Sequence, residues 1–266
     1  MRRFLPRASL AAVLTVLLCA GAAAEIRKVA YPRVKVEIAP AYKPDPAFEE
    51  MRKALADAVA KKDANALFAL VAPGFVWTVG SALAGDFDPG RDPLHNFKVL
   101  FGFRQYGKDA DGGVDDGPYW TSLAAFASET TFYQTAEDGI LVCSPIAASV
   151  EDADVFEEAR AKVETDDEAA DWYFVLRDNT AVARAPDDKG LPLGRLGQEA
   201  VPVLRSHPPA REGQPAPTPT HFEVLMPSGR SGWITASAAL PLDTGRLCYV
   251  AAPGGTWKIA IYDAAE

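Results

Sequence analysis

The side chains best suited to hold a ligand lie in the last third of the chain, where aromatic residues and arginines accompany short β-type runs. Trp233 and Tyr173 lie within such runs, and Arg184 and Arg230 lie in predicted turns. A groove lined with aromatic rings could hold a Pro-rich or peptidoglycan stem peptide, and an arginine could pair with a carboxylate of that ligand. The plainer alternative is that half or more of the aromatics fill a core and that arginines at turns are ordinary. The aromatics concerned are Trp172, Tyr173, Trp233, Tyr249 and Trp257.

No catalytic motif is recognisable in the sequence. It contains no phosphate-binding glycine loop and no dinucleotide fingerprint, and the Gly-Arg-Ser-Gly around Ser231 lacks the spacing of a nucleophile elbow. The three histidines, His95, His207 and His221, stand alone. We therefore expect a protein that is not an enzyme, with no cofactor and no metal.

An acidic loop at residues 109–115 is similar to a calcium loop, because carboxylates at alternate positions can converge on a hard cation. The details do not fit, since the sixth position is Val114 instead of glycine and the twelfth is Trp120 instead of glutamate. We interpret this loop, and the acidic run at residues 164–168, as solvated surface.

Two of the three cysteines, Cys143 and Cys248, lie in apolar β-type runs. In an oxidising compartment they could form a disulfide that closes a loop of roughly 100 residues and contributes about 4 kcal/mol in the chain-entropy model. The alternative is two separate buried thiols in strands. For Cys143, a place in the core fits the apolar context better than a catalytic role.

Residues 1–24 have the three parts of a secretory signal peptide: a basic start, an apolar run at residues 10–18 and a small-residue exit at residues 21–24. The apolar run is far shorter than the roughly 20 residues that a membrane-spanning helix needs, and no later segment supplies a run of that length. Cys19 follows Leu18, where a lipid anchor would need a small residue. We therefore expect a soluble periplasmic or secreted protein with no membrane span.

The composition is acidic. The formal charge is −9, and loss of the three leader arginines would make it −12. Such a chain repels phosphate backbones and anionic lipid surfaces, so nucleic acid is a poor candidate partner. The same acidity is also an ordinary means of keeping a protein soluble.

The first half predicts an α+β domain at residues 45–150, preceded by an extended lead-in at residues 25–44. Three prolines break the lead-in, which favours an extended segment over a core element. Asp45 and Asp63 are suited to cap two helices, and Pro73-Gly74 is expected to end the second. The other expected elements are strands at 75–79 and 140–143 and helices within 92–106 and 118–128.

Residues 151–171 are acidic and predict a linker or a solvent-facing helix, in both cases a boundary. From residue 172 onward, short β-type runs separated by turns indicate a small barrel over residues 172–242. The Pro-rich insert at 208–220 predicts a projecting loop. Residues 243–266 predict a hairpin with strands at 246–251 and 256–262. The barrel runs are 173–176, 180–183, 191–196, 201–204, 222–225 and 232–235.

The segments TAVARAPDDKGLPLGRLGQEAVPVL and FEVLMPSGRSGWITASAALPL resemble a bacterial SH3-like (SH3b) domain. The resemblance is carried by a Gly-x-Leu turn and by a Ser-Gly-Arg-x-Gly-Trp-Ile hairpin that contains Gly232, Trp233 and Ile234. It implies that the glycine makes a tight turn and that the tryptophan closes the barrel floor. It also implies a non-catalytic envelope module that binds peptidoglycan or a partner protein. The long Pro-rich insert departs from the compact family pattern.

The helix, helix, strand order of residues 46–79 and the closing GGTWKIAIY are similar to SnoaL-like cone-shaped α+β domains, although too few strands lie between them for a full cone. One hypothesis is that the C-terminal hairpin crosses back to pair with residues 75–79 and 139–143. This arrangement would bring Cys248 near Cys143.

We therefore expect an α+β fold: an N-terminal helical α+β domain, then a small SH3-like β-barrel, then an extra C-terminal β-hairpin. The favoured function is an exported non-catalytic envelope protein whose SH3-like domain binds a peptide, peptidoglycan or a protein partner. The alternative is a periplasmic enzyme with a small-molecule pocket in residues 45–145. A third possibility is a barrel that only packs against the first half and has no ligand.

Overall fold

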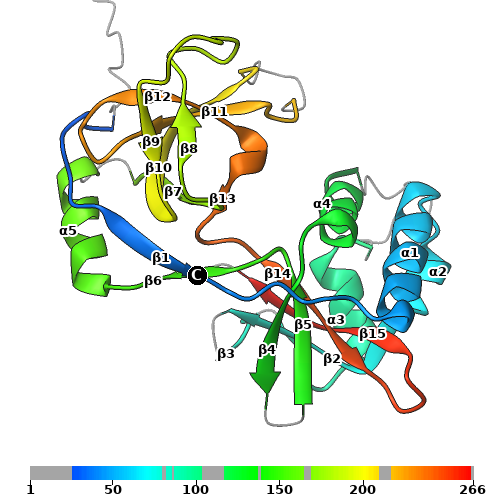
Figure 1. Ribbon diagram of the computed structural model, residues 1–266. Coiled ribbons are helices and arrows are strands. Elements are labelled where there is room, and N and C mark those ends of the chain that lie inside the picture. The colour runs from blue at the N-terminus through cyan, green and yellow to red at the C-terminus, as the bar shows by residue number, and fades with distance from the viewer. Residues whose placement is uncertain are drawn as a thin grey trace, which may run out of the picture.

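The computed structural model describes residues 26–79, 82–85, 87–103, 117–136, 139–164, 169–209 and 217–264. Over these residues the chain is a mixed α+β protein with five α-helices, a six-stranded sheet and a seven-stranded sheet (Figure 1). The expected leader, the calcium-like loop, most of the acidic run and most of the Pro-rich insert lie outside the described residues. No helix in these ranges is long and apolar enough to cross a membrane.

Two aspartates begin the first two helices, as the sequence predicts. The Asp45 carboxylate accepts a hydrogen bond of 2.8 Å from the Phe48 backbone N–H at the start of α1 (Pro46–Ala60). The Asp63 carboxylate accepts one of 3.0 Å from the Ala66 N–H at the start of α2 (Ala64–Phe68). These bonds satisfy N–H groups that a helix leaves unpaired in its first turn.

The predicted end of the second helix at Pro73-Gly74 is wrong. The helix α2 ends at Phe68, and both residues lie inside β2 (Val71–Val79). They fall where the register between β2 and β15 shifts, between the pairs made by Ile259 and Ile261. A bulge of this kind is one of the few positions in a sheet that tolerate proline.

The C-terminal hairpin closes the first sheet. The strand β14 (Arg246–Ala251) pairs antiparallel with β5 (Gly139–Ser144), and β15 (Trp257–Ala264) runs parallel to β2. The strand order is β3-β2-β15-β14-β5-β4, with β3 (Ala82–Leu83) and β4 (Phe132–Ala136) at the edges. The hypothesis that the hairpin crosses back to the first half is confirmed, so this hairpin is part of the first sheet.

Helices α1, α3 (Pro93–Leu100) and α4 (Gly117–Ser128) gather on one side of this sheet (Figure 1). Their apolar side chains share one core with the strands. The Phe48 ring centroid lies 4.9 Å from that of Trp257 and 5.5 Å from that of Tyr249. Tyr249 and Trp257 therefore fill the core of the first half, and the expectation that they cluster with the barrel is wrong.

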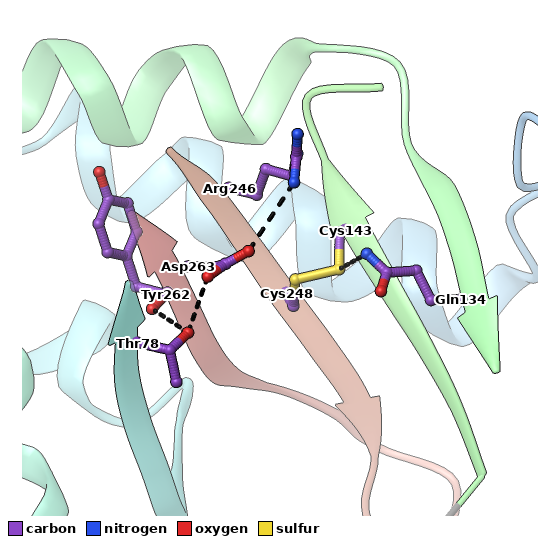
Figure 2. Close-up of a disulfide and its surroundings, with 7 residues drawn as sticks. All are labelled: Thr78, Gln134, Cys143, Arg246, Cys248, Tyr262 and Asp263. Atoms are coloured by element: carbon purple, nitrogen blue, oxygen red, sulfur yellow. Dashed lines mark hydrogen bonds and ion pairs between the residues drawn. A yellow bond between two sulfur atoms is a disulfide. The ribbon is translucent and has the colours of Figure 1, made fainter. Parts of the chain in front are cut away.

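A disulfide joins Cys143 of β5 to Cys248 of β14, which lie directly opposite each other (Figure 2). Their Cα atoms are 4.0 Å apart, and both side chains are buried. Of the two alternatives that the sequence leaves open, the structure has the bonded pair. The bond ties the returning hairpin to a strand 105 residues earlier in the chain.

The lead-in is extended, but it is part of the core. The strand β1 (Val34–Ile38) pairs antiparallel with β10 (Glu199–His207) and with β6 (Ala148–Val150). Val34 and Val36 are buried. The expectation that residues 25–44 lie outside the core is wrong, because the prolines flank the paired stretch and do not interrupt it.

The acidic segment forms a helix, α5 (Ala153–Val163), which buries Ala159 and Val163. The strands that follow pair in the order β13-β7-β10-β11-β12, and their interior side chains form a separate core. The short pair β8-β9 attaches to β12 through a bridge between Ala183 and Trp233. Among the described residues no pairing of β12 with β13 closes this path. The bounds are β7 (Asp171–Val175), β8 (Thr180–Val182), β9 (Gly194–Leu196), β11 (His221–Leu225), β12 (Ser231–Thr235) and β13 (Ala239–Pro241), with a 3₁₀ turn at Ala236–Ala238.

We expect the double variant Cys143→Ser, Cys248→Ser to lose about 2 to 5 kcal/mol of unfolding free energy, because the unfolded chain regains the freedom of a long loop. Urea unfolding of the oxidised protein and the variant measures this loss. Reductant should destabilise the wild type and leave the variant unchanged. Equal urea midpoints for wild type and variant would contradict the expectation.

Candidate functional site

Trp233 lies on the outward face of the three strands β10, β11 and β12. Gly232 and Ile234 on either side of it are buried, whereas Trp233 is half-buried, as the alternation of a strand requires. Trp233 is paired with Glu223 of β11, and Glu223 is paired with Arg205 of β10. Ile234, not Trp233, belongs to the buried core of these strands, so the expectation that the tryptophan closes a barrel floor is wrong.

A polar network holds a cation beside the Trp233 ring. The Arg205 guanidinium lies 5.6 Å from the ring centroid and forms an ion pair with the Glu223 carboxylate. Glu223 is 5% exposed and also accepts a hydrogen bond of 2.8 Å from the Ser231 hydroxyl. The His207 ring meets the Trp233 ring edge-on, with centroids 6.0 Å apart. We call these five residues, Arg205, His207, Glu223, Ser231 and Trp233, the Trp233 face.

The other three predicted ligand residues are not gathered at this face. Arg184 is exposed and directly follows Ala183, whose backbone exchanges two hydrogen bonds with Trp233. Tyr173 packs its ring against Phe222 of the second-half core, 4.9 Å between centroids. Arg230 lies in the turn between β11 and β12 and lines a separate small pocket. Among the described residues, no single groove contains all four predicted side chains.

Tyr173 lines a cavity of about 500 Å³ between α5, β7 and the segment after β13. This volume is in the range of small-ligand sites. Trp172 forms one wall, and its ring meets that of Phe156 edge-on at 5.1 Å. Asp171 and Asp243 also line the cavity and are exposed. We call this cavity the α5 pocket.

Hydrogen bonds within the α5 pocket stabilise the ionised form of the Glu164 carboxylate. Burial raises the pKa of Glu164, but hydrogen bonds from Arg160 and Trp172 outweigh burial and hold the pKa below its ordinary value. The Trp172 indole N–H donates to Glu164 at 2.9 Å, and the Arg160 Nε–H donates to both carboxylate oxygens at 3.1 and 3.2 Å. Burial, with the nearby charge of Asp171, raises the pKa of Tyr173, so its hydroxyl stays protonated at neutral pH.

The structure brings two histidines together. His207 of β10 and His221 of β11 are directly opposite each other, so the expectation that all three histidines stand alone is wrong for this pair. The His221 Nδ1 lies 3.1 Å from the Thr220 hydroxyl oxygen. No group of three or more His, Cys, Asp or Glu within the part of the chain that the structure describes is arranged to hold a metal ion.

Sequence reasoning missed Arg205 and Glu223, the two charged residues of the Trp233 face. One signal was available, since Arg205 and His207 follow the predicted strand at 201–204 at alternate positions and share a face because β10 continues to His207. The pairing of Arg205 with Glu223 depends on the register between β10 and β11, which includes an irregularity after Val203. A single sequence does not reveal such a shift.

We expect Glu164→Gln to make the stability of the fold depend less on pH in the acid range. A lowered folded-state pKa stabilises the fold above the ordinary glutamate value of 4.5, and this contribution is lost as the pH falls through the folded-state pKa. Between about pH 5.5 and 3.5, the thermal unfolding midpoint of the variant should therefore fall less than that of the wild type. The matched control is Glu158→Gln on the same helix, whose partner is the exposed Lys162. Equal slopes for the wild type and Glu164→Gln would contradict the assignment.

No family model, no curated protein and no solved structure matches this chain.

Proposed function

We propose that this chain is an exported, non-catalytic binding protein that holds an extended peptide or peptidoglycan ligand on the Trp233 face. The strand order β13-β7-β10-β11-β12, with a 3₁₀ turn between β12 and β13, supports an SH3-like barrel in the second half. Such small barrels commonly present ligand sites on a strand face and its adjoining loops.

The observation that carries the proposal is the half-exposed Trp233 ring with a fixed guanidinium beside it. The exposed part of the ring offers an apolar surface for a sugar ring or a prolyl side chain. Arg205 is two-thirds exposed, at 66%, while its carboxylate partner is buried. The Arg205 N–H groups that Glu223 does not use therefore favour a ligand that carries carbonyl or carboxylate oxygens next to an apolar group.

The position of this face fits a long ligand better than a small one. Ala183, which pairs with Trp233, begins the loop between β8 and β9, and His207 directly precedes the Pro-rich insert. A polymer lying across Trp233 would thus run between two loops. The signal-like leader supports a periplasmic or secreted location, where peptidoglycan and envelope proteins are candidate partners.

The test is a pulldown of the purified protein with purified peptidoglycan. We expect the wild type to be retained and Trp233→Ala to bind at least about tenfold more weakly, because truncation of a central aromatic anchor commonly has an effect of this size. Arg184→Ala, next to the face, should weaken retention less. Urea unfolding establishes that each variant is folded before the comparison is made.

The matched control is Tyr133→Ala, which removes another exposed aromatic ring, from the edge strand β4 of the first sheet. This variant should be retained like the wild type. Failure of the wild type to bind would remove peptidoglycan as the ligand. Retention of a folded Trp233→Ala at the wild-type level would remove the Trp233 face as the site.

A further inference from the structure

Three arginines from distant parts of the sequence line one small pocket. Arg33 directly precedes β1, Arg195 lies in β9, and Arg230 lies in the turn between β11 and β12. The pocket has a volume of about 200 Å³, and none of the residues that line it carries a carboxylate. In a chain of formal charge −9, three arginines in the lining of one cavity concentrate positive charge where an anion would be stabilised.

The backbone around this pocket is held tightly. The Tyr31 N–H donates to the Pro227 carbonyl at 3.1 Å, and the Tyr31 hydroxyl donates to the Leu225 carbonyl at 2.6 Å. Gly229 has φ +80°, and a Cβ there would lie 2.8 Å from the Ala30 nitrogen. The lead-in therefore packs directly onto the turn that carries Arg230. This contact places Arg33 and Arg230 in the lining of the same pocket.

The three guanidinium groups are unequally neutralised. Arg33 forms an ion pair of 3.0 Å with Glu199, which is 1% exposed. Arg195 donates one hydrogen bond of 3.0 Å to the neutral Asn179 carbonyl. Within the part of the chain that the structure describes, the Arg230 side chain has no ion pair or hydrogen bond. Two of the three arginines that line the pocket, Arg195 and Arg230, therefore have no carboxylate partner among the described residues.

Apart from Ser228 and the three arginines, the side chains of the lining are apolar. Leu193 and Met226 are the largest of them, together with Leu196. A guanidinium fork matches the two oxygens of a carboxylate, and an apolar wall accepts an aliphatic group attached to it. Small inorganic anions would leave the apolar walls without a partner.

We propose that this pocket, formed by Arg33, Arg195 and Arg230, binds the terminal carboxylate of a peptide whose last side chain is small and aliphatic. Arg195 and Arg230 hold the carboxylate, and Leu193 and Met226 contact the aliphatic side chain. Arg33 is positioned by Glu199 and contributes its remaining N–H donors. This site uses other residues than the Trp233 face and does not depend on the function proposed for that face.

The test is a calorimetric titration of the purified protein with N-acetyl-trialanine that has a free terminal carboxylate. The matched probe is the same peptide with a terminal amide, and inorganic phosphate is the third probe. We expect the free acid to bind at least about tenfold more tightly than the amide and than phosphate, because each lost charge-assisted bond costs about 1.5 kcal/mol or more.

Arg230→Gln should weaken binding of the free acid by at least about tenfold, since it removes a charge without removing a folding contact. The matched control, Arg177→Gln, removes an exposed arginine outside the pocket and should bind like the wild type. The proposal is overturned if the free acid does not bind the wild type, if acid and amide bind equally, if phosphate binds more tightly, or if Arg230→Gln has no effect. None of these results depends on binding to peptidoglycan.

Discussion

The pairing of the C-terminal hairpin with strands of the first half is the constraint on which the rest of the structure depends. Without β14 and β15, which lie between them, the strands β2 and β5 would not be joined in one sheet, and Phe48 would lose its contacts with Tyr249 and Trp257. The disulfide between Cys143 and Cys248 lies at this pairing, between directly opposed residues. The first core is therefore complete only when the last 20 or so residues have returned to it.

Because of this constraint, the unit formed by α5 and the strands β7 to β13 is an insertion between two strands of the first sheet. The chain leaves the first sheet after β5, forms α5 and the strands β7 to β13, and re-enters the first sheet at β14. The strand β1 adds a second connection, since it pairs with β10 of the inserted unit and with β6. The inserted unit is thus tied to the lead-in through β1. The partly exposed Trp233 lies on the outward face of its strands β10, β11 and β12.

Local signals predicted much of the fold, and long-range pairing accounts for what they missed. Asp45 and Asp63 mark helix starts because capping is a short-range interaction, and the hairpin strands follow from alternation around a glycine turn. The sequence does not predict that the lead-in belongs to the core, because its prolines disfavour a strand. The strands that pair with it, β6 and β10, lie more than 100 residues away. Of the ligand residues, Trp233 was identifiable by type, but Arg205 and Glu223 meet only through the register of β10 and β11.

The arginine pocket follows from the same long-range pairing. Arg33 belongs to the lead-in, whereas Arg195 and Arg230 belong to the inserted unit, so the three meet only when β1 is paired with β10. Glu199 is the first residue of β10 and is paired with Lys35 of β1. It is also the ion-pair partner of Arg33. Burial raises the pKa of Glu199, while hydrogen bonding from the Gly197 N–H and the charge of Arg33 oppose this shift. The ion pair therefore couples docking of the lead-in to the charge state of the pocket, because without Arg33 the Glu199 carboxylate would be a buried charge that lacks this cationic partner.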